Sequence, residues 1–263
     1  VSEIMVAGDK ACGVRLEDGR EFRARAVAAN VNPKLLFGKL LDKSNVPPEF
    51  YARMMNWRCT SGTFRMNVAL RELPDFTCLP GKIQAGHHTA GIILAPDVEY
   101  MERAYIEARQ NGWSQNPVVE MLIPSTIDST LAPSDHHVAS LFCQHFDYDL
   151  PGDRSWDDER EAAADVIVDT VNRFAPNFSD AVIARQILSP LDLERDFGLI
   201  GGDIFHGALD LNQLFSLRPT LGYADYHMPL EGLYLCGSGA HPGGGVTGAP
   251  GHNAAREILR ELK

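Results

Sequence analysis

The sequence has few cysteines, fewer basic than acidic residues and no long apolar run. It contains 24 Lys and Arg against 35 Asp and Glu, and the net charge of −11 argues against nucleic-acid binding. No stretch approaches 18 consecutive apolar residues and no signal peptide is visible, so we predict a cytoplasmic protein without a membrane span. A targeting peptide upstream of Val1 would change that localisation. The cysteines form no C-x-x-C pair, which argues against zinc fingers and redox dithiols; they are Cys12, Cys59, Cys78, Cys143 and Cys236.

Motifs for metal and hydrolase chemistry are also missing. The pairs His87-His88 and His136-His137 lie outside any H-E-x-x-H motif, and adjacent strand residues point to opposite faces. Each pair therefore offers at most one ligand to a given site, and we predict no metal site. The run Gly237-Ser238-Gly239 lacks the G-x-S-x-G spacing of a nucleophile elbow, which argues against a hydrolase.

The densest signal lies near the end of the chain. Residues 233–236 form a short apolar run that predicts a buried strand. Apolar residues at helical spacing between Ala254 and Leu262 predict a helix that begins near Val246 or Thr247, with Pro250 in its first turn. The free N–H groups at such a helix start favour an anion. Between these two elements lie seven glycines, which would let a ligand approach bare backbone: Gly237, Gly239, Gly243, Gly244, Gly245, Gly248 and Gly251.

A literal G-x-G-x-x-G occurs within this segment, at Gly243, Gly245 and Gly248. In a simple dinucleotide fingerprint the first glycine directly follows the strand, but here six residues separate it from Cys236. The fingerprint also needs an acidic residue about 20 positions further on, beyond Lys263. Another alternative is a glycine-rich turn that only packs a terminal helix, although seven glycines exceed what such a turn needs.

Residues 237–248, GSGAHPGGGVTG, resemble the C-terminal flavin-binding motif of the phytoene desaturase and carotenoid isomerase-like flavoproteins. Residues 201–207, GGDIFHG, and the following Arg218-Pro219 resemble a second segment of that group. The resemblance implies FAD as cofactor, with Gly237 and Ser238 near the pyrophosphate and ribityl chain and residues 244–247 near the flavin ring. The implied cofactor-binding residues are Gly237, Ser238, Gly239, His241, Gly244, Gly245, Val246, Thr247 and Gly248.

The resemblance also implies an N-terminal strand–GxGxxG–helix, which this sequence lacks. Residues 1–7, 11–16 and 21–30 instead predict an antiparallel meander of three strands. We therefore hypothesise that the polypeptide is the C-terminal half of a larger flavoenzyme and is inactive by itself.

The middle of the chain mixes strands and helices without strict alternation. Strands are predicted at 63–70, 117–123 and 137–146. Asp97 and Gly112 bound a helix that buries Met101, Ala104, Tyr105 and Ala108.

A capping box, Ser155-x-x-Asp158, opens a second helix that Pro176 ends, and Ser189-Pro190 caps a third. We predict a mixed α/β (α+β) fold. An incomplete two-dinucleotide-binding-type FAD domain takes residues 1–57 and 200–263, and an inserted α+β substrate domain takes residues 58–199.

The function that the resemblance implies is that of an FAD-dependent oxidoreductase acting on a C–H or C–C bond of an apolar substrate, polyenes included. No catalytic residue is assigned. His206 and His241 either hydrogen-bond loop backbone or contact flavin or substrate. The expected partners are an apolar small molecule, a membrane surface for substrate access and a second copy of the chain. The alternative function is a non-catalytic interaction module that has lost the flavin-binding half.

Overall fold

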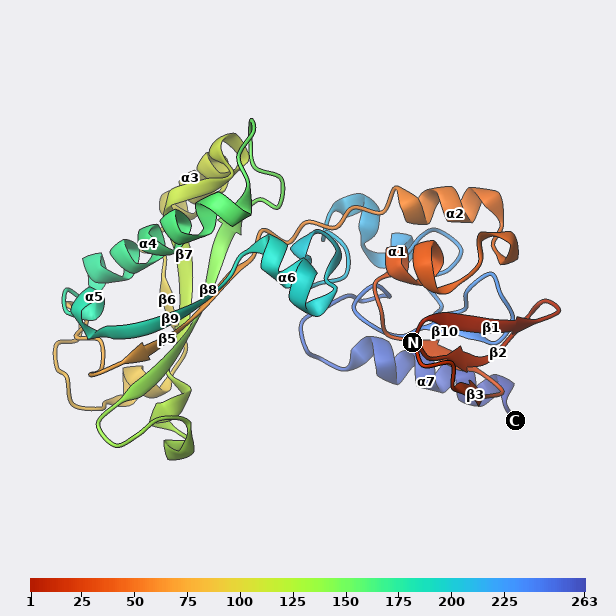
Figure 1. Ribbon diagram of the computed structural model, residues 1–263, viewed down its shortest axis with the longest axis horizontal. Helices are drawn as coiled ribbons and strands as arrows, with labels where there is room; N and C mark the ends of the chain where they lie inside the picture. The colour runs from red at the N-terminus through yellow and green to blue at the C-terminus, as the bar shows by residue number, and fades with distance from the viewer. The chain divides into compact units, whose positions relative to one another are not determined.

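The computed structural model describes residues 1–263, which divide into two units (Figure 1). The first unit contains residues 1–61 and 198–263, and the second contains residues 62–197. These bounds lie close to the predicted 1–57, 200–263 and 58–199. Each unit encloses its own hydrophobic core.

The first unit begins with a three-stranded antiparallel sheet of order β1-β2-β3. Its strands are β1 (Glu3–Ala7), β2 (Lys10–Arg15) and β3 (Glu21–Arg23). The predicted meander is thus confirmed, but the prediction of one strand over residues 21–30 is wrong. The chain leaves this sheet after β3 and forms a separate strand, β4 (Val27–Ala29), in a second sheet.

The second sheet is a parallel pair of β4 and β10 (Leu233–Leu235). The Val27 N–H donates to the Gly232 carbonyl at 2.8 Å, and the Cys236 N–H donates to the Ala29 carbonyl at 2.8 Å. Strand β10 is fully buried, which confirms the predicted apolar strand. Because the strands are parallel, the chain leaves both of them at the same edge of the sheet, the one formed by the carboxyl ends of the two strands.

Three helices pack around these sheets: α1 (Pro33–Leu35), α2 (Pro48–Met55) and α7 (Ala249–Glu261). Helix α1 continues as a π-helical turn over 36–40. Short 3-10 turns lie at residues 43–45, 200–202, 211–213 and 215–217. The core of the unit includes Leu36, Phe37, Phe50, Met54, Leu233 and Leu235.

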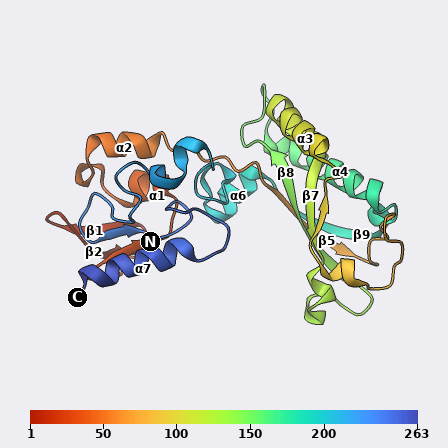
Figure 2. The same ribbon diagram turned by 180° about the vertical axis from the view of Figure 1, so that it is seen from behind.

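The second unit is built on a five-stranded antiparallel sheet of order β6-β7-β8-β5-β9 (Figure 2). Burial alternates strictly along β5, as the period of two along a strand requires when one face is covered. The predicted strands are confirmed. The strands are β5 (Phe64–Leu70), β6 (Ile92–Leu94), β7 (Trp113–Leu122), β8 (His137–Phe146) and β9 (Val182–Leu188).

Helices α3 (Val98–Asn111) and α4 (Trp156–Phe174) pack against β7. Asp97 and Gly112 cap α3 as predicted, but the predicted buried face is partly wrong. Met101 and Tyr105 are both 49% exposed, while Tyr100 is buried beside Ala104 and Ala108. The reason is that the Tyr100 hydroxyl donates to the Pro117 carbonyl at 3.0 Å, which turns this face toward β7.

Two further helices complete the second unit, α5 (Phe178–Ala181) and α6 (Pro190–Phe197). The Ser155 hydroxyl caps α4 by accepting from the Asp157 N–H at 3.1 Å, whereas the reciprocal bonds of a capping box occur at the start of α6. There the Ser189 N–H donates to the Asp192 carboxylate at 2.9 Å and the Asp192 N–H donates to the Ser189 hydroxyl at 3.2 Å.

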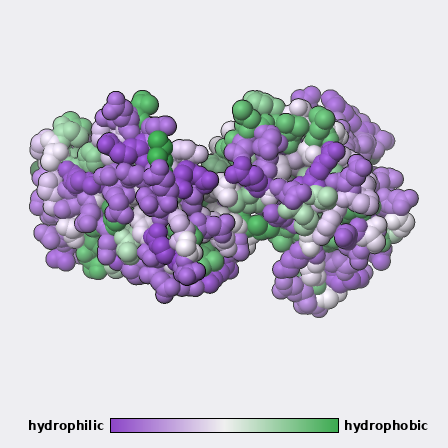
Figure 3. Space-filling model, turned by 90° about the horizontal axis from the view of Figure 1, so that it is seen from above, coloured by the Kyte–Doolittle hydropathy of each residue, from purple (hydrophilic) through white to green (hydrophobic).

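No helix, the 19-residue α4 included, combines the length and apolar composition that a membrane span requires. On the face shown in Figure 3, hydrophilic residues cover most of both units and apolar residues form separate patches.

Candidate functional site

The glycine-rich segment begins where β4 and β10 end. Residues 30–33 follow β4, and residues 236–240 follow β10, so both loops leave the same edge of the parallel pair. The carboxyl ends of parallel strands are where open α/β sheets bind ligands. The topology therefore makes this edge the candidate site.

The first two glycines of the segment are needed for contact between these two loops. A Cβ on Gly237 would lie 2.5 Å from the carbonyl oxygen of Asn30, and a Cβ on Gly239 would lie 2.5 Å from Cδ of Pro33. The neighbouring loop of the same chain thus occupies the space at both missing Cβ positions. Contact between a cofactor and the backbone of these two glycines stays a prediction.

The later glycines differ among themselves. A Cβ on Gly244 would lie 2.6 Å from the Phe205 ring, so this glycine also serves packing. Gly245 and Gly248 have φ angles of +117° and +71°; only Thr247 Cγ2, at 3.8 Å, lies within 4 Å of the missing Cβ position of Gly245, and no atom does so for Gly248. Only a glycine adopts such backbone angles without strain, and the space beside these two residues is open.

Helix α7 starts later than predicted. Val246 has a φ of +56° and is fully exposed, and Gly248 is the left-handed N-cap. These angles are incompatible with a helix, so the first helical residue is Ala249 rather than Val246 or Thr247. The Thr247 hydroxyl accepts from the Ala249 N–H at 3.2 Å. Pro250 falls in the first turn, as predicted.

The segment before α7 carries a row of unused hydrogen-bond donors. The backbone N–H groups of residues 243–248 donate to no acceptor in the protein, and residues 245–248 are exposed. They precede a 13-residue helix, whose start carries about half a positive charge from the macrodipole. Residues 237–252 include no acidic side chain. The arrangement suits an anionic group such as a phosphate.

Arg218 ties the glycine-rich segment to the rest of the unit. Its side chain is fully buried, and its Nε and Nη2 atoms donate to the Ser238 carbonyl at 2.9 and 2.7 Å. The same guanidinium donates to four further carbonyl groups, those of Phe205, Gly207, Ala208 and Gln213. Ser238 is therefore held through its backbone.

Asp203 is the buried acidic group near this arginine. Burial raises the pKa of Asp203, an effect opposed by backbone N–H groups, among them that of Phe205 at 2.7 Å, and by Arg218. Burial lowers the pKa of Arg218, and Asp203 opposes that shift. Each buried charge thus depends on the other for partial compensation.

His241 lies within the glycine-rich segment, and His206 lies in the loop that packs on it. The Nδ1 atoms of both rings are buried and lack a hydrogen-bond partner, so neither ring bonds to loop backbone through this atom. Burial, and then the Arg218 charge, lower the pKa of His206, which keeps its ring neutral at physiological pH. The Trp57 indole N–H donates to the His206 carbonyl at 2.9 Å and fixes this loop.

Sequence reasoning missed three contributors to the site. Asn30 packs on Gly237, and Pro33 packs on Gly239. The ring of Trp57 lies against Arg218. The sequence shows two short apolar runs, each followed by a small or polar residue, but no local pattern indicates that the two strands pair.

None of the metal arrangements considered is present. No group of three or more His, Cys, Asp or Glu side chains is placed to hold a metal ion. His88 instead serves the fold, because its Nδ1 accepts from the Ala85 N–H at 3.2 Å and its Nε2 lies 2.9 Å from the Pro74 carbonyl.

The fold is one that is found in oxidoreductases of known structure. An oxidoreductase from Methanosarcina mazei of known structure has the same fold, with a TM-score of 0.59 and 15% identity over 99% of this chain and 48% of that chain. No family model matches the sequence.

Among curated relatives, the mouse (Mus musculus) pyridine nucleotide-disulfide oxidoreductase domain-containing protein 2 is 43% identical over 269 residues, which span 100% of this chain and 46% of the mouse protein. The chloroplastic prolycopene isomerase of Arabidopsis thaliana is 26% identical over 283 residues, which span 100% of this chain and 42% of that protein. The resemblance stated from residues 201–248 is thus confirmed. The chain spans about half the length of the relatives it matches.

Proposed function

We propose that this chain supplies one part of the FAD site of an oxidoreductase of the phytoene dehydrogenase-related type. The observation that carries the proposal is the row of unpaired N–H groups at 243–248, of which residues 245–248 are exposed, at the start of α7 and at the carboxyl edge of the parallel pair. The relatives named as an oxidoreductase and as a carotenoid isomerase support it.

The residues present fit an anionic cofactor. Gly245 and Gly248 leave open space in front of the backbone, and the N–H groups between them would hold phosphate or ring oxygens. Gly237, Gly239 and Gly244 act indirectly, because they allow the loops to pack closely enough to present the others. Bound FAD would supply the capacity to accept a hydride from the substrate.

The buried guanidinium of Arg218 holds the Ser238 backbone, so this chain would orient the cofactor through rigid main-chain groups. His206 is neutral and offers no charge to the site. The substrate is proposed to be apolar, and the channel that would admit it stays a prediction. Contact with a membrane surface and self-association stay predictions as well.

The test uses a chimera in which the part of the mouse relative that this chain does not match is fused to the chain. The purified chimera is expected to carry FAD, measured by visible absorbance and by release on denaturation. If it carries none while folded, the proposal fails and the interaction-module alternative gains support.

A matched pair of variants tests the N–H row itself. Val246 is fully exposed, and Val246→Glu places a negative charge at the donors, while Val246→Gln has nearly the same size without charge. A carboxylate at a helix start stabilises the helix, so loss of FAD in the Glu variant would not reflect unfolding. We expect at least about tenfold weaker FAD binding for Val246→Glu than for Val246→Gln. Equal affinities would contradict the assigned site.

A further inference from the structure

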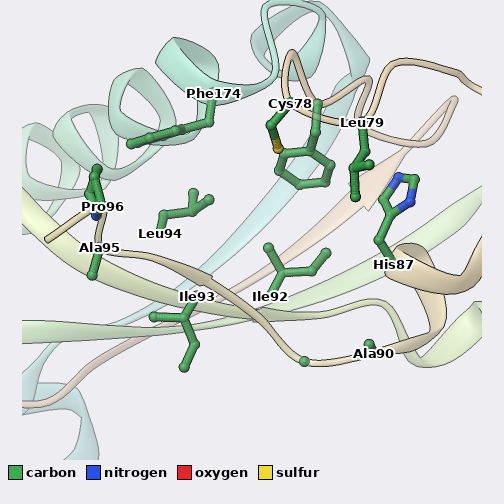
Figure 4. A pocket seen from close by; sticks show the side chains of 12 residues that line it. Cys78, Leu79, His87, Ala90, Ile92, Ile93, Leu94, Ala95, Pro96 and Phe174 are labelled. Carbon is green, nitrogen blue, oxygen red and sulfur yellow. The ribbon is translucent and has the colours of Figure 1, made fainter.

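A cavity of about 400 Å³ lies entirely within the second unit (Figure 4). Its wall combines the loop that carries Phe76 and Leu79, the edge strand β6 with Ile92 and Leu94, and Phe174 at the end of α4. Small-molecule sites enclose roughly 300–1,000 Å³ and are mostly apolar. The cavity falls within that range.

The wall contains no charged side chain. Cys78 and His87 are its only side chains with hydrogen-bonding atoms. Burial, and then His88, hold the pKa of His87 below its usual value, so the ring is neutral at physiological pH. An ionised ligand that moved from water into this cavity would meet no opposite charge, which is strongly unfavourable. An uncharged ligand avoids that cost.

The polar part of the wall is held in place from behind. His88 is buried, and its ring bonds to the Ala85 N–H and the Pro74 carbonyl. The Thr126 hydroxyl donates to the His88 carbonyl at 3.1 Å. These three bonds fix the turn at 86–89 that presents His87, so the wall is formed before any ligand arrives.

The rim of the cavity is apolar too. Leu79 and Ile93 line the wall and are 54% and 66% exposed. A hydrocarbon surface at a cavity edge lets an apolar molecule enter without first meeting polar groups. Exposed apolar residues that gather at a concave site indicate ligand binding more than isolated ones do.

We propose that this cavity binds an uncharged, predominantly hydrocarbon small molecule whose single polar group meets Cys78 or His87. The proposal rests on the proposed function in that the substrate proposed there is apolar, but no residue of the first unit takes part in the cavity. Its test needs no FAD, so the two can fail separately.

The first experiment compares two fluorescent probes with the same ring system on the 263-residue chain. N-phenyl-1-naphthylamine is uncharged, and 8-anilinonaphthalene-1-sulfonate adds one sulfonate. The uncharged probe is expected to bind saturably and at least about tenfold more tightly than the sulfonate. Tighter binding of the sulfonate, or no saturable binding of the uncharged probe, would overturn the proposal.

The second experiment places the probe in the cavity. Cys78 is the exposed cysteine of the chain and lines the wall, so its alkylation by iodoacetamide can be followed by peptide mass spectrometry. A saturating level of N-phenyl-1-naphthylamine is expected to slow alkylation at Cys78 severalfold and to leave Cys12 unchanged. Unchanged reactivity at Cys78 would show that the probe binds elsewhere.

Two pairs of variants complete the test, with circular dichroism to confirm folding. Ala90→Trp fills the cavity, while Ala162→Trp places the same side chain on an exposed residue of α4 outside the wall. Ile93→Asp charges the wall, while Ile83→Asp charges a residue that is 88% exposed and outside it. The first member of each pair is expected to weaken probe binding about tenfold or more. Equal weakening by the controls would contradict the proposed site.

Discussion

Replacement of Arg218 by methionine is expected to destabilise the first unit severely. The guanidinium is fully buried and donates to five carbonyl groups, which would all lose their donor together. Asp203 would lose the positive charge that opposes its burial. Breaking one partner of a buried charged cluster costs about 3–5 kcal/mol, so we expect the free energy of unfolding of this unit to fall by about that amount.

The assay is native-state hydrogen exchange, because the two units need not unfold together. Peptides that cover β10 report on the first unit, and peptides that cover β8 report on the second. The β10 peptides are expected to lose protection while the β8 peptides keep theirs. Arg218→Lys keeps the charge but lacks the planar guanidinium group, so the protection of its β10 peptides should lie between that of the wild type and that of Arg218→Met. A loss below about 1 kcal/mol in Arg218→Met would refute the reasoning.

Three further predictions concern single positions. Gly237→Ala should destabilise the first unit by about 1–3 kcal/mol, because its Cβ would meet Asn30 backbone atoms at 2.5–2.9 Å. Gly251→Ala should stabilise α7 by up to about 1 kcal/mol, because its Cβ meets nothing closer than 3.9 Å. Urea unfolding of the two variants measures both changes. The pKa of His206 is lowered on folding, so its contribution to stability is complete above the unfolded pKa and is lost as the pH falls. His206→Asn tolerates the φ of +56° and should show a shallower loss of unfolding free energy between pH 7 and 5. Equal slopes of unfolding free energy against pH in the two proteins would contradict this. The Cys143 thiol is buried and its pKa is raised, so alkylation should reach it only after the second unit unfolds, and labelling of the native protein would count against the packing of this core.

The sequence predicted those parts of the fold whose signals are local. Strand β8 matches residues 137–146 as expected. Helix α4 begins after Ser155 and ends before Pro176, as predicted. Capping residues, proline and hydrophobic periodicity act within a few residues, so a single sequence contains them fully. The predicted buried face of α3 was partly wrong, because a long-range hydrogen bond from Tyr100 to Pro117 turns the Tyr100 face inward.

The candidate site shows the same division. The sequence by itself determined that residues 237–248 form a glycine-rich loop between a buried strand and a helix, since strand, glycine and helix patterns are local. Tertiary structure decided that Gly237 and Gly239 face the loop after β4, and that Gly245 and Gly248 face open space. It also decided that Arg218 holds Ser238 through its carbonyl. These contacts join residues far apart in the chain, and no local pattern contains the parallel pairing of β4 with β10 that brings them together.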